Sequence, residues 1–173
     1  MKAAVSMVCL AAGLAATGCG YHVAGNTDVL PKAVHTICIP AFGNATVRYK
    51  LTDHMAEALS HEFIARTRYR VVPTPEQADA VLRGNIINYQ EFPSVIDPAT
   101  GRASTIQVYI TLSATLTERA TGKVLYTAPN FQIRNQYEIS IQPQAYFEES
   151  DMAIDRASRE VAQRLVSAIL ENF

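Results

Sequence analysis

The stretch Ser104–Thr117 reads STIQVYITLSATLT, and its apolar and polar residues alternate without a break from Ile106 onward. Successive side chains of a β-strand point to opposite faces, so this period of two predicts a strand with one face on a core and one polar face. A sheet with one polar face has helices on its other face only. The stretch therefore predicts a mostly antiparallel sheet that is covered on one side.

Two segments have the four-residue spacing of an amphipathic helix. Tyr49–Arg66 is one, where Glu62 is expected to pair with Arg66 at the edge of the apolar stripe. Gln144–Phe173 is the other. The apolar stripes consist of Leu51, Met55, Leu59 and Phe63 in the first helix, and of Phe147, Ile154, Ala157, Val161, Leu165, Ala168 and Ile169 in the last.

Further strands are expected on both sides of the first one. They are Val34–Pro40, Tyr69–Val72, Ala80–Phe92, ended by Pro93, and Val124–Ile139, with a bulge or bend at Pro129–Asn130. The expected fold is an α/β (α+β) two-layer sandwich in the order β-α-β-β-β-β-α. Its mostly antiparallel sheet has four to five strands, and two helices cover one face.

The N-terminus has the pattern of a secretory signal. Lys2 precedes an uncharged apolar run, Ala3–Ala16, which is too short to span a membrane as a helix. The small residues Ala16-Thr17-Gly18 then precede Cys19 and resemble the lipobox of bacterial lipoproteins, although an ordinary secreted protein cut nearby or a buried N-terminal helix is an alternative. We predict a signal peptide at 1–18, a lipidated tether at 19–33 and a single domain at 34–173.

Charge and cysteine content narrow the function classes. Without Lys2 the chain carries 14 basic and 16 acidic side chains, which argues against nucleic acid as a partner. Cys9 leaves with the signal and Cys19 takes the lipid, so Cys38 is expected to be a small buried hydrophobe. The fold must therefore be held by its core and not by disulfides.

Catalytic motifs are absent from the sequence. His54, Glu57 and His61 share one side of the first helix, at a spacing that could place two imidazoles and a carboxylate on a metal ion. The same three residues lie on the face that the core does not use, and no second cluster completes a coordination shell. We therefore expect a solvated helix face, no metal, no cofactor and no enzymatic activity.

A binding surface is the remaining candidate. The polar face of Ser104–Thr117 carries Tyr109 among Thr, Ser and Gln, with no Lys or Glu, and would suit another protein, a carbohydrate or a lipid headgroup. Arg102 precedes this strand, and Arg119 and Lys123 follow it. They are candidate phosphate contacts, because Arg binds phosphate through two parallel donors and Lys as a point charge, or else they are ordinary turn charges.

Several segments resemble the LPS-assembly lipoproteins, the LptE-like family. The resemblance begins at Gly18-Cys19-Gly20-Tyr21-His22-Val23-Ala24-Gly25 and spans nearly the whole mature chain. It is carried further by Leu30-Pro31-Lys32, Ile37–Asn44, Arg68–Val72, Ala78–Gly84, Thr121–Tyr126, Tyr146-Phe147 and Leu165–Phe173. The middle segments, Ile37–Asn44 through Ala78–Gly84, are also similar to periplasmic domains of other lipoproteins, including curli-secretion-like ones.

The resemblance implies an outer-membrane lipoprotein on the periplasmic face, lipidated at Cys19 with diacylglycerol and an N-acyl chain. It implies that the chain plugs an LptD-like β-barrel and binds lipopolysaccharide. We hypothesise that the polar sheet face and the loop Pro93–Ala103 pack inside the barrel and hold it assembled. Gly20, which is not Asp, permits export to the outer membrane by the family's sorting rule. An adaptor or pore subunit of another envelope secretion assembly, or a purely structural periplasmic lipoprotein, is the alternative.

Overall fold

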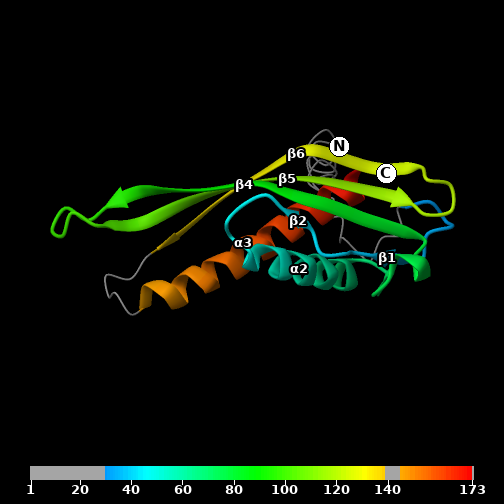
Figure 1. Ribbon diagram of the computed structural model, residues 1–173, viewed down its shortest axis with the longest axis horizontal. Coiled ribbons are helices and arrows are strands. Elements are labelled where there is room, and N and C mark those ends of the chain that lie inside the picture. The colour runs from blue at the N-terminus through cyan, green and yellow to red at the C-terminus, as the bar shows by residue number, and fades with distance from the viewer. Residues whose placement is uncertain (1–29, 139–144, 173) are drawn as a thin grey trace, which may run out of the picture.

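The computed structural model describes residues 30–138 and 145–172, with the backbone alone for 145–151. Figure 1 shows two layers, a long sheet and the helices α2 and α3 beneath it. The signal peptide, Cys19 and residues 19–29 of the tether lie outside the described residues. The elements in chain order are β1 (Thr36–Cys38), β2 (Gly43–Asn44), α2 (Lys50–Arg66), β3 (Arg70–Val72), the 3-10 helix η1 (Pro75–Gln77), β4 (Ala80–Ile96), β5 (Ala103–Glu118), β6 (Val124–Glu138) and α3 (Ala145–Glu171).

The expected α+β fold and its element order are confirmed, with β2 as an additional short strand. The strands lie in the order β3-β1-β4-β5-β6, and β2 also pairs with β4. β4, β5 and β6 form the antiparallel part, whereas β1 runs parallel to β3 and β4, and β2 parallel to β4. The sheet is therefore mixed. The connection from β1 to β3 passes through α2, and such a helical crossover allows the two strands to run parallel. The alternation of apolar and polar residues indicates which face of a strand is exposed to solvent, but it does not indicate the direction in which the strand runs.

The core lies between the helices and one face of β4–β5–β6. The four apolar residues expected on the first helix are all fully buried. Of the stripe expected on α3, Ala168 is half-buried, Phe147 lies outside the described side chains, and the others are buried: Ile154, Ala157, Val161, Leu165 and Ile169. Arg66 pairs with Glu62 at 3.3 Å, as expected, and its Nη1 also donates to Ser167 Oγ of α3 at 2.6 Å. The largest fully buried side chains include Leu51, Met55, Leu59 and Phe63 of α2, Ile110, Leu112 and Leu116 of β5, and Leu165 of α3.

The packed domain begins before residue 34. Leu30 is only 4% exposed, and its backbone N–H donates to the Tyr69 hydroxyl at 2.9 Å. Leu30, which we expected to belong to the tether, thus contributes to the core, whereas Lys32 and Ala33 are exposed. Cys38 is buried within β1, as expected, and burial raises the pKa of its thiol.

A polar clasp joins the start of β1 to the residue before β4. Asp79 Oδ2 accepts hydrogen bonds from the backbone N–H groups of His35 and Thr36 and from the Thr36 hydroxyl, each at 2.9 Å. The His35 N–H, followed by the Thr36 hydroxyl, holds the pKa of the Asp79 carboxyl below its usual range. Hydrogen bonds to the ionised form have this effect, so the clasp is made by a carboxylate.

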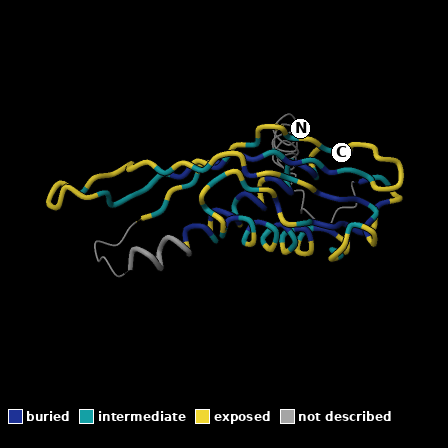
Figure 2. Tube along the Cα trace, in the orientation of Figure 1, coloured by how far each residue is buried: buried dark blue, intermediate teal, exposed yellow. Residues whose placement is uncertain are grey.

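The long strands are longer than the helix that covers them. β4 has 17 residues, or about 55 Å at ~3.3 Å per residue, whereas the 17 residues of α2 make a helix of about 26 Å. The distal end of the β4–β5 hairpin therefore projects beyond the helices (Figure 1), and its residues are exposed or half-buried (Figure 2). We call residues 92–107 the hairpin arm.

Pro93 does not end β4. The expectation that the strand stops there is wrong, because β4 continues to Ile96 and Pro93 pairs with Ile106 of β5. Within the arm no described strand lies on the other side of β4, so Pro93 sits on an edge, where proline is tolerated. The pairing is irregular between Pro93 and Ile96, which is where the strand adapts.

The bulge expected at Pro129–Asn130 is confirmed. The register passes from Leu112 paired with Phe131 to Ala114 paired with Ala128, so Pro129 and Asn130 of β6 lie opposite Ser113 alone. An extra residue in one strand bends it and increases its twist.

Gly84 of β4 should not tolerate a side chain. A Cβ at this position would lie 2.1 Å from a ring carbon of Phe42, which is 2% exposed and whose ring cannot move away without opening the core. We expect Gly84→Ala to lower the free energy of unfolding by about 1–3 kcal/mol, as overpacking does. Thermal denaturation should show a midpoint lower by several degrees.

Ser113→Ala, on the polar side of the neighbouring strand, is the matched control and should unfold near the wild-type temperature. A Gly84→Ala protein as stable as the wild type would mean that Phe42 is not seated over β4.

Candidate functional site

The helices α2 and α3 lie on one side of the sheet and leave its other face uncovered (Figure 1), and η1 borders that face only at one end, near Val81 and Arg83. The side chains of this uncovered face alternate along each strand with the buried ones. None of the side chains along the middle of this face is acidic, and two of them are arginines. We call this set the outer sheet face: Arg83, Asn85, Asn88, Gln90 and Phe92 of β4, Gln107, Tyr109, Thr111, Ser113 and Thr115 of β5, and Gln132, Arg134 and Gln136 of β6.

Tyr109 lies at the centre of this face, between its partners in register, Gln90 and Arg134. The Phe92 ring meets the Tyr109 ring edge-on, with centroids 5.9 Å apart, and the Arg134 guanidinium lies 5.9 Å from the Tyr109 centroid. The Tyr109 hydroxyl donates to Gln107 Oε1 at 3.0 Å. These contacts fix an aromatic ring that is 37% exposed.

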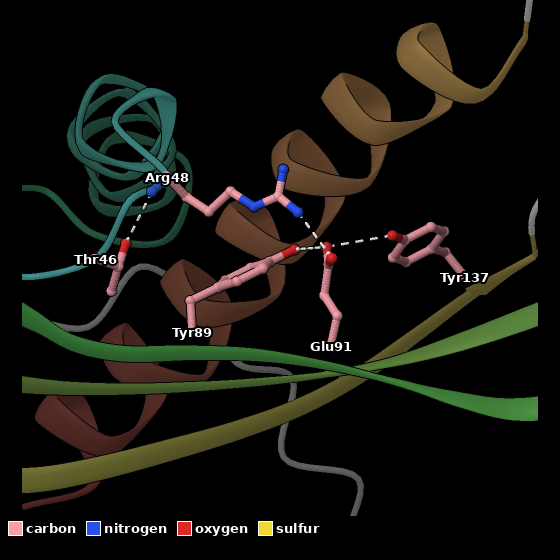
Figure 3. A network of polar contacts seen from close by, with 5 residues as sticks. All are labelled: Thr46, Arg48, Tyr89, Glu91 and Tyr137. Carbon is pink, nitrogen blue, oxygen red and sulfur yellow. Dashed lines mark hydrogen bonds and ion pairs between the residues drawn. The ribbon is translucent and has the colours of Figure 1, made fainter.

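A polar network occupies the opposite, helix-side face at the base of the arm (Figure 3). Glu91 accepts hydrogen bonds from Arg48 Nη2 at 2.8 Å, from the Tyr89 hydroxyl at 2.6 Å and from the Tyr137 hydroxyl at 3.3 Å. The Arg48 guanidinium also lies 5.4 Å from the Tyr89 ring centroid. The backbone N–H of Arg48 donates to the Thr46 hydroxyl at 3.2 Å.

This network joins three parts of the chain at the point where the arm leaves the core. Tyr89 and Glu91 come from β4, Tyr137 from β6, and Arg48 from the loop that precedes α2. Burial, and then the hydrogen bond to Glu91, raise the pKa of Tyr89, so its hydroxyl stays a donor. The arm is therefore fixed to the body by charge-assisted bonds, which are stronger than bonds between neutral groups.

Arg102 lies exposed at the tip of the arm, where a tight turn presents it. The Ala99 N–H and the Thr100 hydroxyl donate to the Asp97 carboxylate at 2.9 and 2.8 Å, and the Ala99 N–H foremost lowers the pKa of Asp97. Gly101 follows with φ of 67°, a conformation that suits glycine.

The three basic candidates from the sequence do not come together. Arg119 and Lys123 lie in the β5–β6 turn, and the 16 residues of β5, about 50 Å of strand, separate them from Arg102 (Figure 1). Arg119 is also engaged structurally, since its Nε donates to the Ala78 carbonyl at 2.7 Å. Arg102, Arg119 and Lys123 thus form two separate basic positions at opposite ends of the sheet.

His54 of the helical cluster faces α3. Its Nδ1 lies 3.8 Å from Asp155 Oδ1, and Asp155 also pairs with Arg159 at 2.7 Å. Within residues 30–138 and 145–172 no three His, Cys, Asp or Glu side chains are placed to hold a metal ion. A groove of about 320 Å³ runs between the helices here, lined by His54, Glu57, Ala58, His61, Glu62, Ala65, Asp155, Arg159 and Gln163.

The sequence pointed to Tyr109 but not to its partners. Phe92 and Arg134 lie 17 and 25 residues away in the chain, and only the strand register brings them to Tyr109. The Glu91 network was missed as well. Its signal is a glutamate at a position of β4 that faces the core side, where a carboxylate needs partners.

The match to a known family covers most of the described chain. The model of the LptE family, described as lipopolysaccharide-assembly, matches residues 34–169. The chain belongs to the LptE family. LptE proteins are non-enzymatic lipoproteins of lipopolysaccharide assembly, which is the general role of this chain. No helix in the part of the LptE chain described above is both long and apolar enough to cross a membrane.

Solved structures share this LptE fold. A lipoprotein from Caulobacter crescentus is 15% identical, with a TM-score of 0.54 over 77% of this chain and 88% of its own. Lipoprotein B from Nitrosomonas europaea is 16% identical, with a TM-score of 0.51 over 86% and 91%. The PelC dodecamer from Paraburkholderia phytofirmans is 12% identical, with a TM-score of 0.53 over 80% and 90%. Curated proteins gave no significant match.

Tyr89 should stay protonated when exposed tyrosines ionise. Its pKa is raised in the folded chain, whereas the unfolded chain ionises this phenol near pH 10. Its contribution to stability is therefore fully present below about pH 10 and is lost as the pH rises above that value. The free energy of unfolding should fall by at most ~1.4 kcal/mol per pH unit on its account, and by less where solvent reaches the ring.

The measurement compares the denaturant unfolding of the wild type and of Tyr89→Phe from about pH 8 to about pH 11, a range that includes the ordinary tyrosine pKa. The variant should be less stable at pH 8 and should lose less stability on the alkaline side. Parallel pH dependences would contradict the network. Tyr49→Phe, at an exposed site, serves as the control.

Proposed function

We propose that this LptE protein is an outer-membrane lipoprotein that plugs and stabilises an LptD-like β-barrel and binds lipopolysaccharide during its assembly at the cell surface. Family membership and the lipobox-like sequence before Cys19 support this proposal. The structural observation that carries it is the hairpin arm, which projects from the body and has exposed apolar side chains along β4.

The arm has the properties of a segment that a partner covers. Phe92, Val95 and Ile96 are 48%, 52% and 60% exposed and lie close together along one strand. Exposed apolar side chains gathered along a strand of a projecting hairpin indicate an interaction site. The Glu91 network fixes the arm at its base, so the arm can enter a partner with little loss of conformational freedom.

The proposed anchor keeps the domain at the membrane. Each buried methylene of an acyl chain would contribute about 0.8 kcal/mol to membrane binding. Several chains on Cys19 together would therefore hold the protein more firmly than a single chain can. The domain would face the periplasm, as its membership of the LptE family suggests. No nucleic acid is expected among the partners, since the net charge is slightly negative.

A second candidate function follows from the likeness to the PelC dodecamer, which is a symmetric assembly. This chain would then be an adaptor or pore subunit of another envelope secretion system. A purely structural periplasmic lipoprotein is the third possibility. Purification of the mature lipoprotein in detergent distinguishes the three functions. A co-purified large β-barrel protein supports the plug, and a symmetric homo-oligomer supports the adaptor. If neither is found, the purely structural role is supported.

Shortening the arm should abolish association with the barrel. Replacing residues 94–105 by Asn-Gly would close the hairpin directly between Pro93 and Ile106, which already pair, with a turn suited to two-residue hairpins. The affinity-tagged wild type should co-purify with the barrel, and the shortened protein should not. An unchanged yield of barrel with the shortened arm would contradict the proposed contact.

The shortened protein must be shown to fold. Its circular dichroism and thermal midpoint should match the wild type, because the removed residues contribute nothing to the buried core. Ser113→Ala, outside the arm, is the control that should retain the barrel.

The basic residues at the two ends of the sheet are proposed contacts for lipopolysaccharide phosphates. Replacing Arg102, Arg119 and Lys123 together by Ala should weaken lipopolysaccharide binding, measured by titration in detergent. Each exposed charge contributes about 0.2–1 kcal/mol, so we expect a loss of roughly threefold to a hundredfold in affinity.

The control is a triple variant that removes the same charge elsewhere, with Lys32, Arg70 and Arg156 replaced by Ala. It should bind like the wild type. An unchanged affinity of the first triple variant would remove these residues from the proposed site. Arg119→Ala alone should also lower the thermal midpoint, because the Ala78 carbonyl loses its donor.

A further inference from the structure

We propose that the outer sheet face is a binding platform for an anionic oligosaccharide, with Tyr109 as the stacking ring and Arg134 as the anion contact. This inference deepens the proposed function and rests on it, since the glycan would be the sugar part of lipopolysaccharide. It concerns a surface different from the basic turns at the two ends of the sheet, and it requires no acyl chain.

The first support is the geometry of the aromatic pair. Tyr109 and Phe92 are 37% and 48% exposed, yet the Tyr109 ring is fixed by the edge of Phe92, by the Arg134 guanidinium and by the hydrogen bond to Gln107. The face of an aromatic ring carries partial negative charge, and the C–H bonds on one side of a sugar ring carry partial positive charge. The exposed part of this fixed ring can therefore contact the C–H groups of a sugar beside Phe92 and Arg134.

The second support is the chemistry around the ring. Gln90 lies directly across from Tyr109 on β4, and Gln107 and Gln136 pair with each other one row further along. Amide side chains donate and accept hydrogen bonds at once, as sugar hydroxyls do. Asn88, Thr111 and Gln132 form the next row in register and continue the same chemistry.

The third support is charge. Arg83 and Arg134 are the charged members of the outer sheet face as defined, and both are positive, whereas Glu138, beside Thr105 at the end of β6, is an acidic residue on the same side of the sheet. A guanidinium binds a phosphate or a carboxylate through two parallel hydrogen bonds. Arg134 already lies over Tyr109, so an anionic group on a stacked sugar would fall within its reach. The outer sheet face therefore favours a phosphorylated or carboxylated glycan over a neutral one.

A protein wall is the competing occupant of this face. The core of a stable protein interface is rich in large apolar and aromatic side chains. Here the aromatic pair is followed along the strands by Thr111, Ser113 and Thr115, which are small and hydroxylated. This composition favours a hydrated polar ligand over a dry protein contact.

The test uses the full mature lipoprotein in detergent and the lipid-free, phosphorylated oligosaccharide released from lipopolysaccharide by mild acid. Calorimetric titration should detect binding that weakens as salt is added. Tyr109→Ala should lower the affinity about five- to tenfold, whereas Tyr109→Phe, which keeps the ring, should stay within about twofold. Arg134→Gln should weaken binding and remove most of its salt dependence.

Tyr49→Ala is the matched control, because Tyr49 is an exposed tyrosine at the start of α2, away from the outer sheet face. It should bind the oligosaccharide like the wild type. Thermal midpoints check that the variants fold; if Tyr109→Ala does not, Arg134→Gln carries the same expectation.

The outcomes separate this inference from the proposed function. If the wild type does not bind the oligosaccharide, or binds it as tightly after Tyr109→Ala, the platform is wrong, although intact lipopolysaccharide and the barrel can still bind. If Tyr109→Ala keeps the oligosaccharide but loses the barrel, the face is a protein interface and the inference is overturned. If neither lipopolysaccharide nor a barrel binds the wild type, the proposed function itself fails.

Discussion

Water is excluded from one side of the β4–β5–β6 ladder by the apolar stripes of α2 and α3, and the rest of the molecule follows from that burial. Leu51, Met55, Leu59 and Phe63 are completely buried against the sheet. Because two helices protect one face only, the other face has to be polar. Because a residue advances about 3.3 Å in a strand but 1.5 Å in a helix, the 17 residues of β4 reach further than the 17 residues of α2 and even than the 27 residues of α3. The outer sheet face and the arm are thus two results of one packing arrangement.

Much of this fold could be predicted from the sequence, because faces and helices leave periodic signals. The helix over Tyr49–Arg66, the bulge at Pro129–Asn130 and the order of elements are all confirmed. Strand direction leaves no such signal, so the parallel edge formed by β1 and β3 was not anticipated. Pro93 misled the prediction, since proline ends a strand in the middle of a sheet but not on an edge without a second neighbour.

The residues of the candidate site were harder to predict from the sequence, for a related reason. We predicted phosphate contacts at the basic residues that flank one strand, Arg102, Arg119 and Lys123. Residues at the two ends of a strand are separated by its whole length, so these three residues do not meet. The groups that do meet, Tyr109 with Phe92 and Arg134, belong to three strands, and their contact depends on a register that the chain sets over a distance. The Glu91 network likewise joins residues that are 43 and 46 positions apart.

The two prolines within the long strands have a consequence for self-association. Pro93 interrupts β4 where the arm has an open side, and Pro129, with its bulge, interrupts β6, the outermost strand of the described sheet. A strand edge lacking regular N–H donors is a poor template for a further strand. Molecules concentrated on one membrane surface would therefore be less able to pair edge to edge into continuous sheets or fibrils, although Phe92, Val95 and Ile96 of the arm are exposed.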